Sequence, residues 1–111
     1  MCEIFGISTA SKYPANAFLR SFIEDSREHH SGWGIALIED GHASIEKEPV
    51  QASESRYLNE RLRCLNLTGD MLAHIRLATV GYCVYENCHP FTGFDAEGRR
   101  WTLIHNGTIF E

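Results

Sequence analysis

The segment from residue 32 to residue 48 constrains the fold more than any other part of the chain. Residues 32–38 form a nearly continuous apolar run, which is typical of a strand covered on both faces. Asp40-Gly41 follows it, and this dipeptide favours a type I′ hairpin turn. Residues 42–48 then alternate in polarity and predict the returning strand. We therefore expect an antiparallel pair of strands.

Two segments show the apolar spacing of amphipathic helices, residues 14–28 and residues 52–64. Ser53 stands near the start of the second segment and is a plausible N-cap. The apolar positions are Phe18, Leu19, Phe22 and Ile23 in the first helix, and Leu58, Leu62 and Leu65 in the second. Each helix therefore has one face to bury against a sheet.

Three further segments predict strands: residues 2–8, 71–79 and 100–105. Residues 81–94 are expected to form a loop. The order is strand, helix, hairpin, helix, strand, strand. It favours the α+β class, with helices packed on a mixed or antiparallel sheet.

Composition limits the classes of function. The chain has 111 residues, 43% hydrophobic and 23% charged, as expected for one soluble globular domain. Its net charge is −5 and its ten basic residues are scattered, so nothing favours nucleic acid. No apolar stretch approaches the roughly 20 residues that span a bilayer, and the start does not resemble a signal peptide. We expect a cytoplasmic protein without nucleic-acid or membrane partners.

The cysteines do not predict a metal site. Cys83, Cys88 and His89 are spaced as zinc ligands can be, but a second compact pair is missing because Cys64 stands alone. A cysteine-based metal or redox protein is therefore the least favoured interpretation. We expect no metal, no cofactor and no disulfide, with the three later cysteines buried or half-buried as free thiols.

Cys2 stands directly behind the initiator Met1. Removal of Met1 would leave a thiol and a free α-amine on one residue. A thiolate is a strong nucleophile, and an α-amine with a pKa of about 7.7–8.0 can accept a proton near neutral pH. The alternative is that position 2 merely holds a small residue.

Two later features fit the same chemistry. Asn106-Gly107 ends a predicted strand and could supply a side-chain amide and a backbone N–H to an oxyanion hole, worth roughly 3–4 kcal/mol per donor. The alternative is a type I′ turn. Arg76 lies in an apolar run and could bind a carboxylate through a bidentate fork, or it could pair with an acidic residue. Together these features predict cleavage of an amide on an amino-acid-like substrate. Trp33, His74 and His105 are interpreted as core residues.

Five segments, in this order, resemble the class II glutamine amidotransferases, which are N-terminal-nucleophile hydrolases. The segments are Met-Cys-Glu-Ile-Phe-Gly-Ile at 1–7, His-Ser-Gly-Trp-Gly-Ile-Ala at 30–36, Ala-His-Ile-Arg-Leu-Ala-Thr at 73–79, Asn-Cys-His-Pro-Phe at 87–91 and His-Asn-Gly-Thr-Ile at 105–109. The Arg-Leu-Ala-Thr version resembles the small stand-alone members. The resemblance implies a four-layer αββα sandwich.

The resemblance also implies roles for individual residues. Cys2 would attack the side-chain amide of glutamine, form a γ-glutamyl thioester and release ammonia, while Asn106 and Gly107 hold the oxyanion. Arg76 would bind the substrate α-carboxylate. The remaining members of the implied substrate site are Leu77, Thr79 and His89.

The family has a further acidic residue, which binds the substrate amine, beyond the oxyanion motif. Residues 1–111 end before it, so we expect the N-terminal part of a single type-2 amidotransferase domain and an incomplete sandwich. The expected partners are glutamine or a γ-glutamyl small molecule, and an ammonia acceptor or a second copy of the chain. Two alternatives remain open: a γ-glutamyl peptide or conjugate hydrolase, and a non-catalytic regulatory or interaction module.

Overall fold

Two antiparallel sheets and two helices make up the described chain, so the predicted α+β class is confirmed. The structure is a computed structural model and describes residues 2–64 and 67–107. The elements are β1 (Glu3–Ile7), α1 (Asn16–Glu24), η1 (Asp25–Arg27), β2 (Gly32–Glu39), β3 (His42–Glu48), η2 (Ala52–Glu54), α2 (Arg56–Cys64), β4 (Asp70–Arg76), η3 (Tyr85–Asn87), β5 (Phe91–Phe94) and β6 (Arg100–Leu103).

The larger sheet has the strand order β1-β4-β2-β3, and every neighbouring pair is antiparallel. The β2–β3 hairpin forms as predicted. Asp40 and Gly41 have φ angles of 50° and 77°, the left-handed values that a type I′ turn requires at both central positions. The smaller sheet is the antiparallel pair β5–β6.

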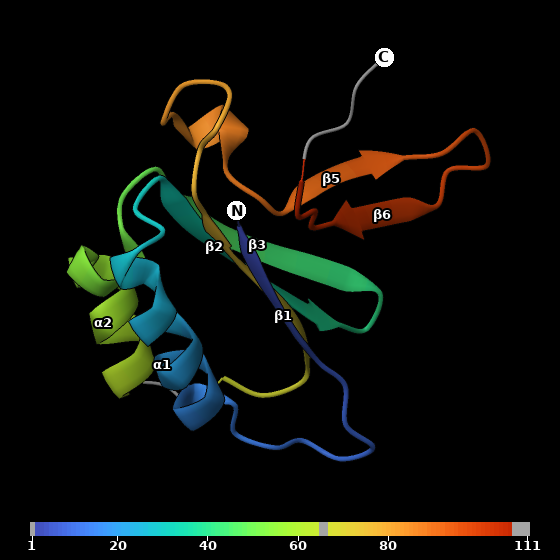
Figure 1. Ribbon diagram of the computed structural model, residues 1–111. Helices are drawn as coiled ribbons and strands as arrows, with labels where there is room; N and C mark the ends of the chain where they lie inside the picture. Colours follow the sequence, from blue (N-terminus) through green and yellow to red (C-terminus); the bar gives the residue numbers. More distant parts are fainter. Residues whose placement is uncertain (1, 65–66, 108–111) are drawn as a thin grey trace.

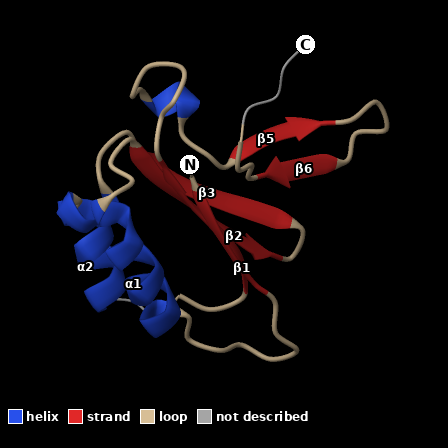
Figure 2. Cartoon of the chain, in the orientation of Figure 1, coloured by secondary structure: helices blue, strands red, loops and turns tan. Residues whose placement is uncertain are grey.

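Both helices pack on one face of the larger sheet, and β5–β6 lies on its other side (Figures 1 and 2). Trp33 is 2% exposed, so its interpretation as a core residue is confirmed. Leu19, Ile23, Leu58, Leu62, Ala73 and Ile75 are among the other buried core residues. Phe18 departs from the predicted apolar face because its side chain is 49% exposed and lies beside Tyr13. Leu65 lies outside the described residues.

The second helix begins later than predicted. Residues 52–54 form the short η2 turn, and α2 starts only at Arg56. The N–H of Leu58 donates to Oγ of Ser55 at 3.0 Å, so Ser55 is the N-cap and the prediction of Ser53 was wrong. The first helix is likewise shorter than predicted, because α1 spans Asn16–Glu24 and η1 continues the turn to Arg27.

Strand boundaries near the C-terminal end also differ from the prediction. β4 ends at Arg76 rather than at residue 79, and β6 ends at Leu103 rather than at residue 105. The predicted loop over residues 81–94 contains β5. This strand is short, follows a proline and includes Gly93, so its local signal is weak.

Gly34 on β2 lets the segment before β5 approach the larger sheet. A Cβ built at Gly34 would lie 1.7 Å from the carbonyl oxygen of His89 and 2.8 Å from Cδ of Pro90. No side chain fits at that separation. The backbone of residues 89–90 therefore packs directly on β2, and this contact sets where the second sheet starts.

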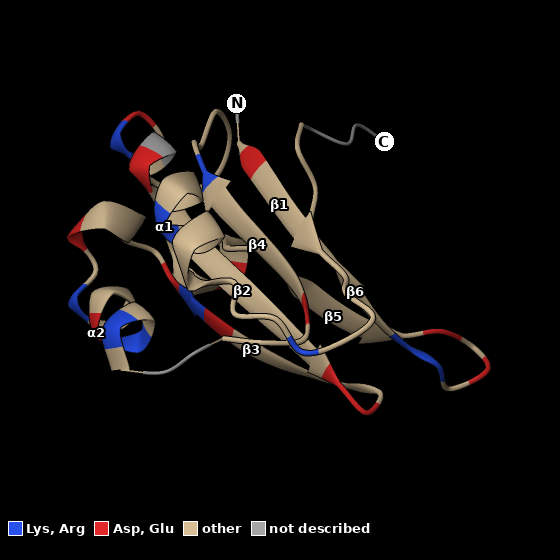
Figure 3. Cartoon of the chain, turned by 90° about the horizontal axis from the view of Figure 1, so that it is seen from below, with Lys and Arg blue, Asp and Glu red and all other residues tan. Residues whose placement is uncertain are grey.

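Charged residues of both signs are interspersed over the elements, and the basic residues of α2 stand beside acidic ones (Figure 3). Within residues 2–64 and 67–107, no helix has the length and apolar character needed to cross a membrane.

We predict that Gly34→Ala destabilises the protein by about 3 kcal/mol or more, because the new methyl group overlaps main-chain atoms that cannot move independently. Gly93→Ala is the matched control, since a Cβ at Gly93 meets nothing within 4 Å. Chemical denaturation of both variants measures the difference. Equal stabilities of the two variants would contradict the close packing at β2.

Candidate active site

Antiparallel pairing of β1 with β4 brings Cys2 beside the end of β4. Ile4 lies opposite His74. Cys2 stands two residues before Ile4, and Arg76 stands two residues after His74. In an antiparallel pair these two offsets run in the same direction, so Cys2 comes beside Arg76. Because side chains alternate along a strand, all four belong to the face away from the helices. The thiol of Cys2 donates to the carbonyl oxygen of Leu77 at 3.8 Å.

Arg76 is 7% exposed, yet it has no carboxylate partner in the described part of the chain. Its Nη1 donates to the carbonyl oxygen of Tyr82 at 2.9 Å, and its Nη2 donates to that of Val80 at 3.1 Å. The alternative of an ion pair with an acidic residue is therefore not observed among the described residues. A guanidinium has five N–H donors, so donors remain for a ligand.

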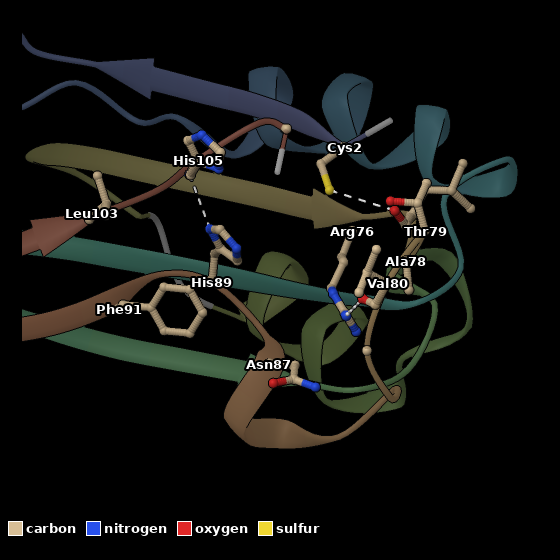
Figure 4. A pocket seen from close by; sticks show the side chains of 13 residues that line it. Cys2, Arg76, Ala78, Thr79, Val80, Asn87, His89, Phe91, Leu103 and His105 are labelled. Atoms are coloured by element: carbon tan, nitrogen blue, oxygen red, sulfur yellow. Dashed lines mark hydrogen bonds between the residues drawn. The ribbon is translucent and has the colours of Figure 1, made fainter. Parts of the chain in front are cut away.

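Cys2 and Arg76 line one cavity of about 450 Å³ (Figure 4). Six of the seven predicted site residues line it: Cys2, Arg76, Leu77, Thr79, His89 and Gly107. The seventh, Asn106, is exposed and does not line the cavity. The cavity has the size of a small-molecule site.

The backbone at Asn106-Gly107 is not a type I′ turn. Such a turn needs a positive φ at both residues. Gly107 has a φ of 127°, but Asn106 is not among the residues with positive φ. The hairpin interpretation of this pair is therefore wrong, and the segment remains available to present the N–H of Gly107.

Seven of the described residues that line the cavity were not predicted: Ala78, Val80, Gly81, Asn87, Phe91, Leu103 and His105. Four of them, Ala78, Asn87, Phe91 and His105, belong to the motifs quoted above, so motif membership was the available signal. The side chains of Phe91 and Leu103 are paired across β5–β6.

Lys47 on β3 holds the segment that carries His89. Its Nζ donates to the carbonyl oxygens of Cys88 at 2.9 Å and Pro90 at 3.1 Å. The same ammonium lies 4.9 Å from the ring centroid of Tyr85 and 5.1 Å from that of Phe91, within the range of cation–π attraction. No local sequence pattern links Lys47 to this site.

Three histidines meet beside the cavity, and two of them, His89 and His105, line it. The rings of His74 and His89 are stacked, with centroids 4.0 Å apart and planes 5° apart. Nε2 of His74 lies 2.9 Å from the carbonyl oxygen of His105, and the N–H of His105 donates to Nδ1 of His89 at 3.0 Å. His74 is 1% exposed, so its interpretation as a hydrogen-bonded core histidine is confirmed.

Both stacked rings are neutral at physiological pH. Burial lowers the pKa of His74 to about 4, with a further contribution from His89 and Arg76 that outweighs the bond to the His105 carbonyl. Burial also lowers the pKa of His89 to about 4, assisted by His105, Arg76 and Lys47. The positive charge of Arg76, and at His89 also that of Lys47, disfavours protonation of the ring.

Two of the three later cysteines differ from expectation. Cys64 and Cys83 are exposed, so the prediction of their burial was wrong, while Cys88 is buried. Burial raises the pKa of the Cys88 thiol, which donates to the carbonyl oxygens of Glu48 and Val84. Within the described residues, no group of three or more His, Cys, Asp or Glu side chains could hold a metal ion.

Comparison with known proteins gives a family match along the whole chain. Residues 1–111 match the family described as "Glutamine amidotransferases class-II". An uncharacterized protein of Methanocaldococcus jannaschii is 37% identical over 110 residues, covering 98% of this chain and 30% of that protein. YafJ of Escherichia coli, provisionally named a glutamine amidotransferase, is 30% identical over 112 residues, covering 98% of this chain and 44% of that protein.

A third relative is the glutamine–fructose-6-phosphate aminotransferase of Staphylococcus epidermidis. It is 34% identical over 76 residues, which cover 68% of this chain and 12% of that enzyme. The chain therefore spans less than half the length of each of these relatives. No solved structure matches the chain significantly.

We predict that the free energy of unfolding falls as pH drops from about 6.5 to 4. In this window a histidine of the unfolded chain, with a pKa near 6.5, binds a proton that the folded protein excludes. The shift at His74 alone corresponds to about 3 kcal/mol. Denaturant titrations at several pH values measure the loss.

His74→Gln removes the titrating ring, so its stability should fall less over the same window. His30→Gln, at an exposed position, is the control for removing any histidine. An unchanged pH dependence in His74→Gln would show that the proton is not excluded at this ring.

Proposed function

Because the chain belongs to the class II glutamine amidotransferases, we propose that it hydrolyses the side-chain amide of glutamine with Cys2 as the nucleophile. One observation carries the proposal. Cys2, Arg76 and Gly107 come from three distant parts of the sequence and line one cavity. Nucleophile, carboxylate binder and oxyanion donor must all reach one small substrate.

The proposed reaction starts with removal of Met1, which lies outside the described residues. The α-amine of Cys2 takes the thiol proton, through a water molecule, and the sulfur attacks the amide carbon of glutamine. The resulting tetrahedral intermediate collapses as the C–N bond breaks, and the departing nitrogen takes the proton and leaves as ammonia. Water then cleaves the γ-glutamyl thioester, which releases glutamate and restores the thiol.

The oxyanion of the intermediate would be held by the N–H of Gly107 and the side-chain amide of Asn106. Gly107 lines the cavity, which supports its role. Asn106 is exposed, so its side chain must turn inward when substrate binds. Such tightening on substrate binding is common, because catalytic contacts in free enzymes are often incomplete.

Arg76 would bind the α-carboxylate of the substrate. The proposal is supported by a nearly buried guanidinium that donates only to two main-chain carbonyls in the described chain. A buried charge is costly unless it is paired, so a carboxylate ligand would complete its partners. Leu77 and Thr79 follow Arg76 along the cavity wall and would shape the space around the same group.

We further propose that residues 1–111 form the N-terminal part of a type-2 amidotransferase domain with a four-layer αββα sandwich. Helices α1 and α2 cover one face of the larger sheet, and β5–β6 lies on the other side (Figure 1). Phe91 and Leu103 both line the cavity, so one face of the second sheet looks toward the first. These features support a helix layer on one face of the larger sheet and a second sheet on its other side.

Ammonia released at this site would serve an acceptor on another domain or protein. The name of the Staphylococcus epidermidis relative pairs glutamine with fructose 6-phosphate, but only 12% of that enzyme is matched, so we do not extend the sugar to this chain. We propose a cytoplasmic location, where a thiol nucleophile stays reduced.

We predict that Arg76→Lys raises the KM for glutamine about tenfold or more in the full natural chain lacking Met1. An ammonium cannot reproduce the planar bidentate fork. Arg100→Lys, outside the cavity, is the control and should leave KM unchanged. A γ-glutamyl peptide assayed in parallel tests the conjugate-hydrolase alternative. Unchanged KM in Arg76→Lys would mean that Arg76 does not bind the carboxylate.

We predict that a glutamine-like electrophile alkylates Cys2 faster than the exposed Cys64 and Cys83 only when Met1 is absent. With Met1 attached, the nitrogen of Cys2 is part of a peptide bond and is no longer basic. Peptide mapping after limiting alkylation of both forms measures the preference. Equal labelling of Cys2 in the two forms would remove the free amine from the mechanism, and absence of both preference and turnover would favour a non-catalytic module.

A further inference from the structure

The backbone of His105 is held on two sides by the stacked rings of His74 and His89. Its N–H donates to Nδ1 of His89 at 3.0 Å (Figure 4). Its carbonyl oxygen accepts from Nε2 of His74 at 2.9 Å. We call these two rings the histidine clamp. His105 directly precedes Asn106-Gly107, so the clamp restrains the chain where it enters the proposed oxyanion segment.

The clamp requires one proton arrangement in each ring. A carbonyl oxygen only accepts, so Nε2 of His74 must carry the proton. A backbone N–H only donates, so Nδ1 of His89 must be bare and its proton must lie on Nε2. Protonation of His89, or a change of its tautomer, would replace the acceptor by a donor and break the bond to His105.

This proton arrangement leaves one ring nitrogen of His74 without a partner in the described chain. Its Nδ1 is buried without a hydrogen-bond partner among the described residues. Such orphaned groups are rare in folded proteins and usually have a reason. Nδ1 is here a bare acceptor to which no described residue donates, and moving the proton to it would leave Nε2 unable to donate to His105.

The larger sheet fixes the positions of both rings of the clamp. His74 lies between Ile4 on β1 and Gly34 on β2 in the register of the sheet. The backbone of His89 packs directly on Gly34, and Lys47 binds the carbonyl oxygens on both sides of it, at Cys88 and Pro90. The larger sheet therefore fixes the two rings. Their hydrogen bonds to the main chain of His105 fix that residue in turn.

We propose that His74 and His89 are positioning residues that fix the backbone of His105 and thereby aim the N–H of Gly107 at the cavity beside Cys2. The inference rests on the reaction proposed above. Neither ring needs to touch the reacting atoms. An oxyanion donor acts only within hydrogen-bond distance of the developing charge, so a small displacement of the segment costs rate rather than substrate affinity.

The test compares variants that keep or remove one hydrogen-bonding atom in the full natural chain lacking Met1. His89→Asn keeps an acceptor near the position of Nδ1, and His89→Leu removes it. His74→Gln keeps a donor near the position of Nε2, and His74→Leu removes it. His42→Leu, at an exposed position, is the control. We expect the leucine variants of His74 and His89 to lose about 100-fold in kcat for glutamine with KM changed less than about threefold.

His89→Asn and His74→Gln should recover most of that loss. Equal loss in the Asn and Leu variants would overturn the inference, because the acceptor would then not be the cause. A raised KM with unchanged kcat in His89→Leu would also overturn it, since His89 would then be a substrate contact. Full activity in both leucine variants would overturn it while leaving the proposed function intact.

Amide hydrogen exchange gives a readout that does not depend on activity. The His105 amide should exchange slowly in the wild type and in His89→Asn, and at least about tenfold faster in His89→Leu, with a parallel change at Gly107. A wild type without glutaminase activity refutes the proposed function, and the clamp is then judged on these exchange rates alone. If His89→Leu does not fold, an unprotected His105 amide in the wild type would by itself overturn the inference.

Discussion

The antiparallel pairing of β1 with β4 is the constraint on which the site depends. It joins residues that are far apart in the sequence, such as Glu3 with Ile75 and Ile7 with Met71, and assigns every side chain of both strands to one of two faces. Ile4 and His74 fall on the face away from the helices, with Cys2 and Arg76 at the end of the same row, while Ala73 and Ile75 enter the core. A slip of one residue would exchange the faces. Cys2 would then point toward the helices, and the thiol could not share a cavity with Arg76.

The two cationic side chains of the described site, Arg76 and Lys47, donate their hydrogen bonds to main-chain carbonyls. Among the described residues, Arg76 donates to the carbonyl oxygens of Tyr82 and Val80, and Lys47 to those of Cys88 and Pro90. Carbonyl dipoles stabilise a cation without cancelling its charge, so the site keeps a field that suits an anionic group. Burial is the main cause of the lowered pKa of His89, and the same cations lower it further. The charge distribution thus favours a substrate carboxylate and adds to the effect of burial in keeping His89 neutral.

Local patterns predicted those elements whose signal lies within a few residues. The Asp40-Gly41 turn formed as expected, because the left-handed conformations of a type I′ turn depend on those two residues themselves. The cap of α2 was misassigned to Ser53, since Ser53 and Ser55 have the same local chemistry and only the start of the helix at Arg56 distinguishes them. β5 was missed because its four residues gain their order from pairing with β6 and from the contact of residues 89–90 with Gly34.

The sequence by itself determined the chemistry available to this protein: a cysteine behind Met1, an arginine within an apolar strand and an Asn-Gly pair, in an order that identified the family. The tertiary structure alone decided how these groups are used. It brought Gly107 into the cavity and left Asn106 exposed, and it held His105 between His74 and His89. It also assigned Lys47, from the far strand of the sheet, to the segment around His89. The reason is physical: each of these contacts joins residues from different elements, and its existence depends on strand register and close packing that no local pattern encodes.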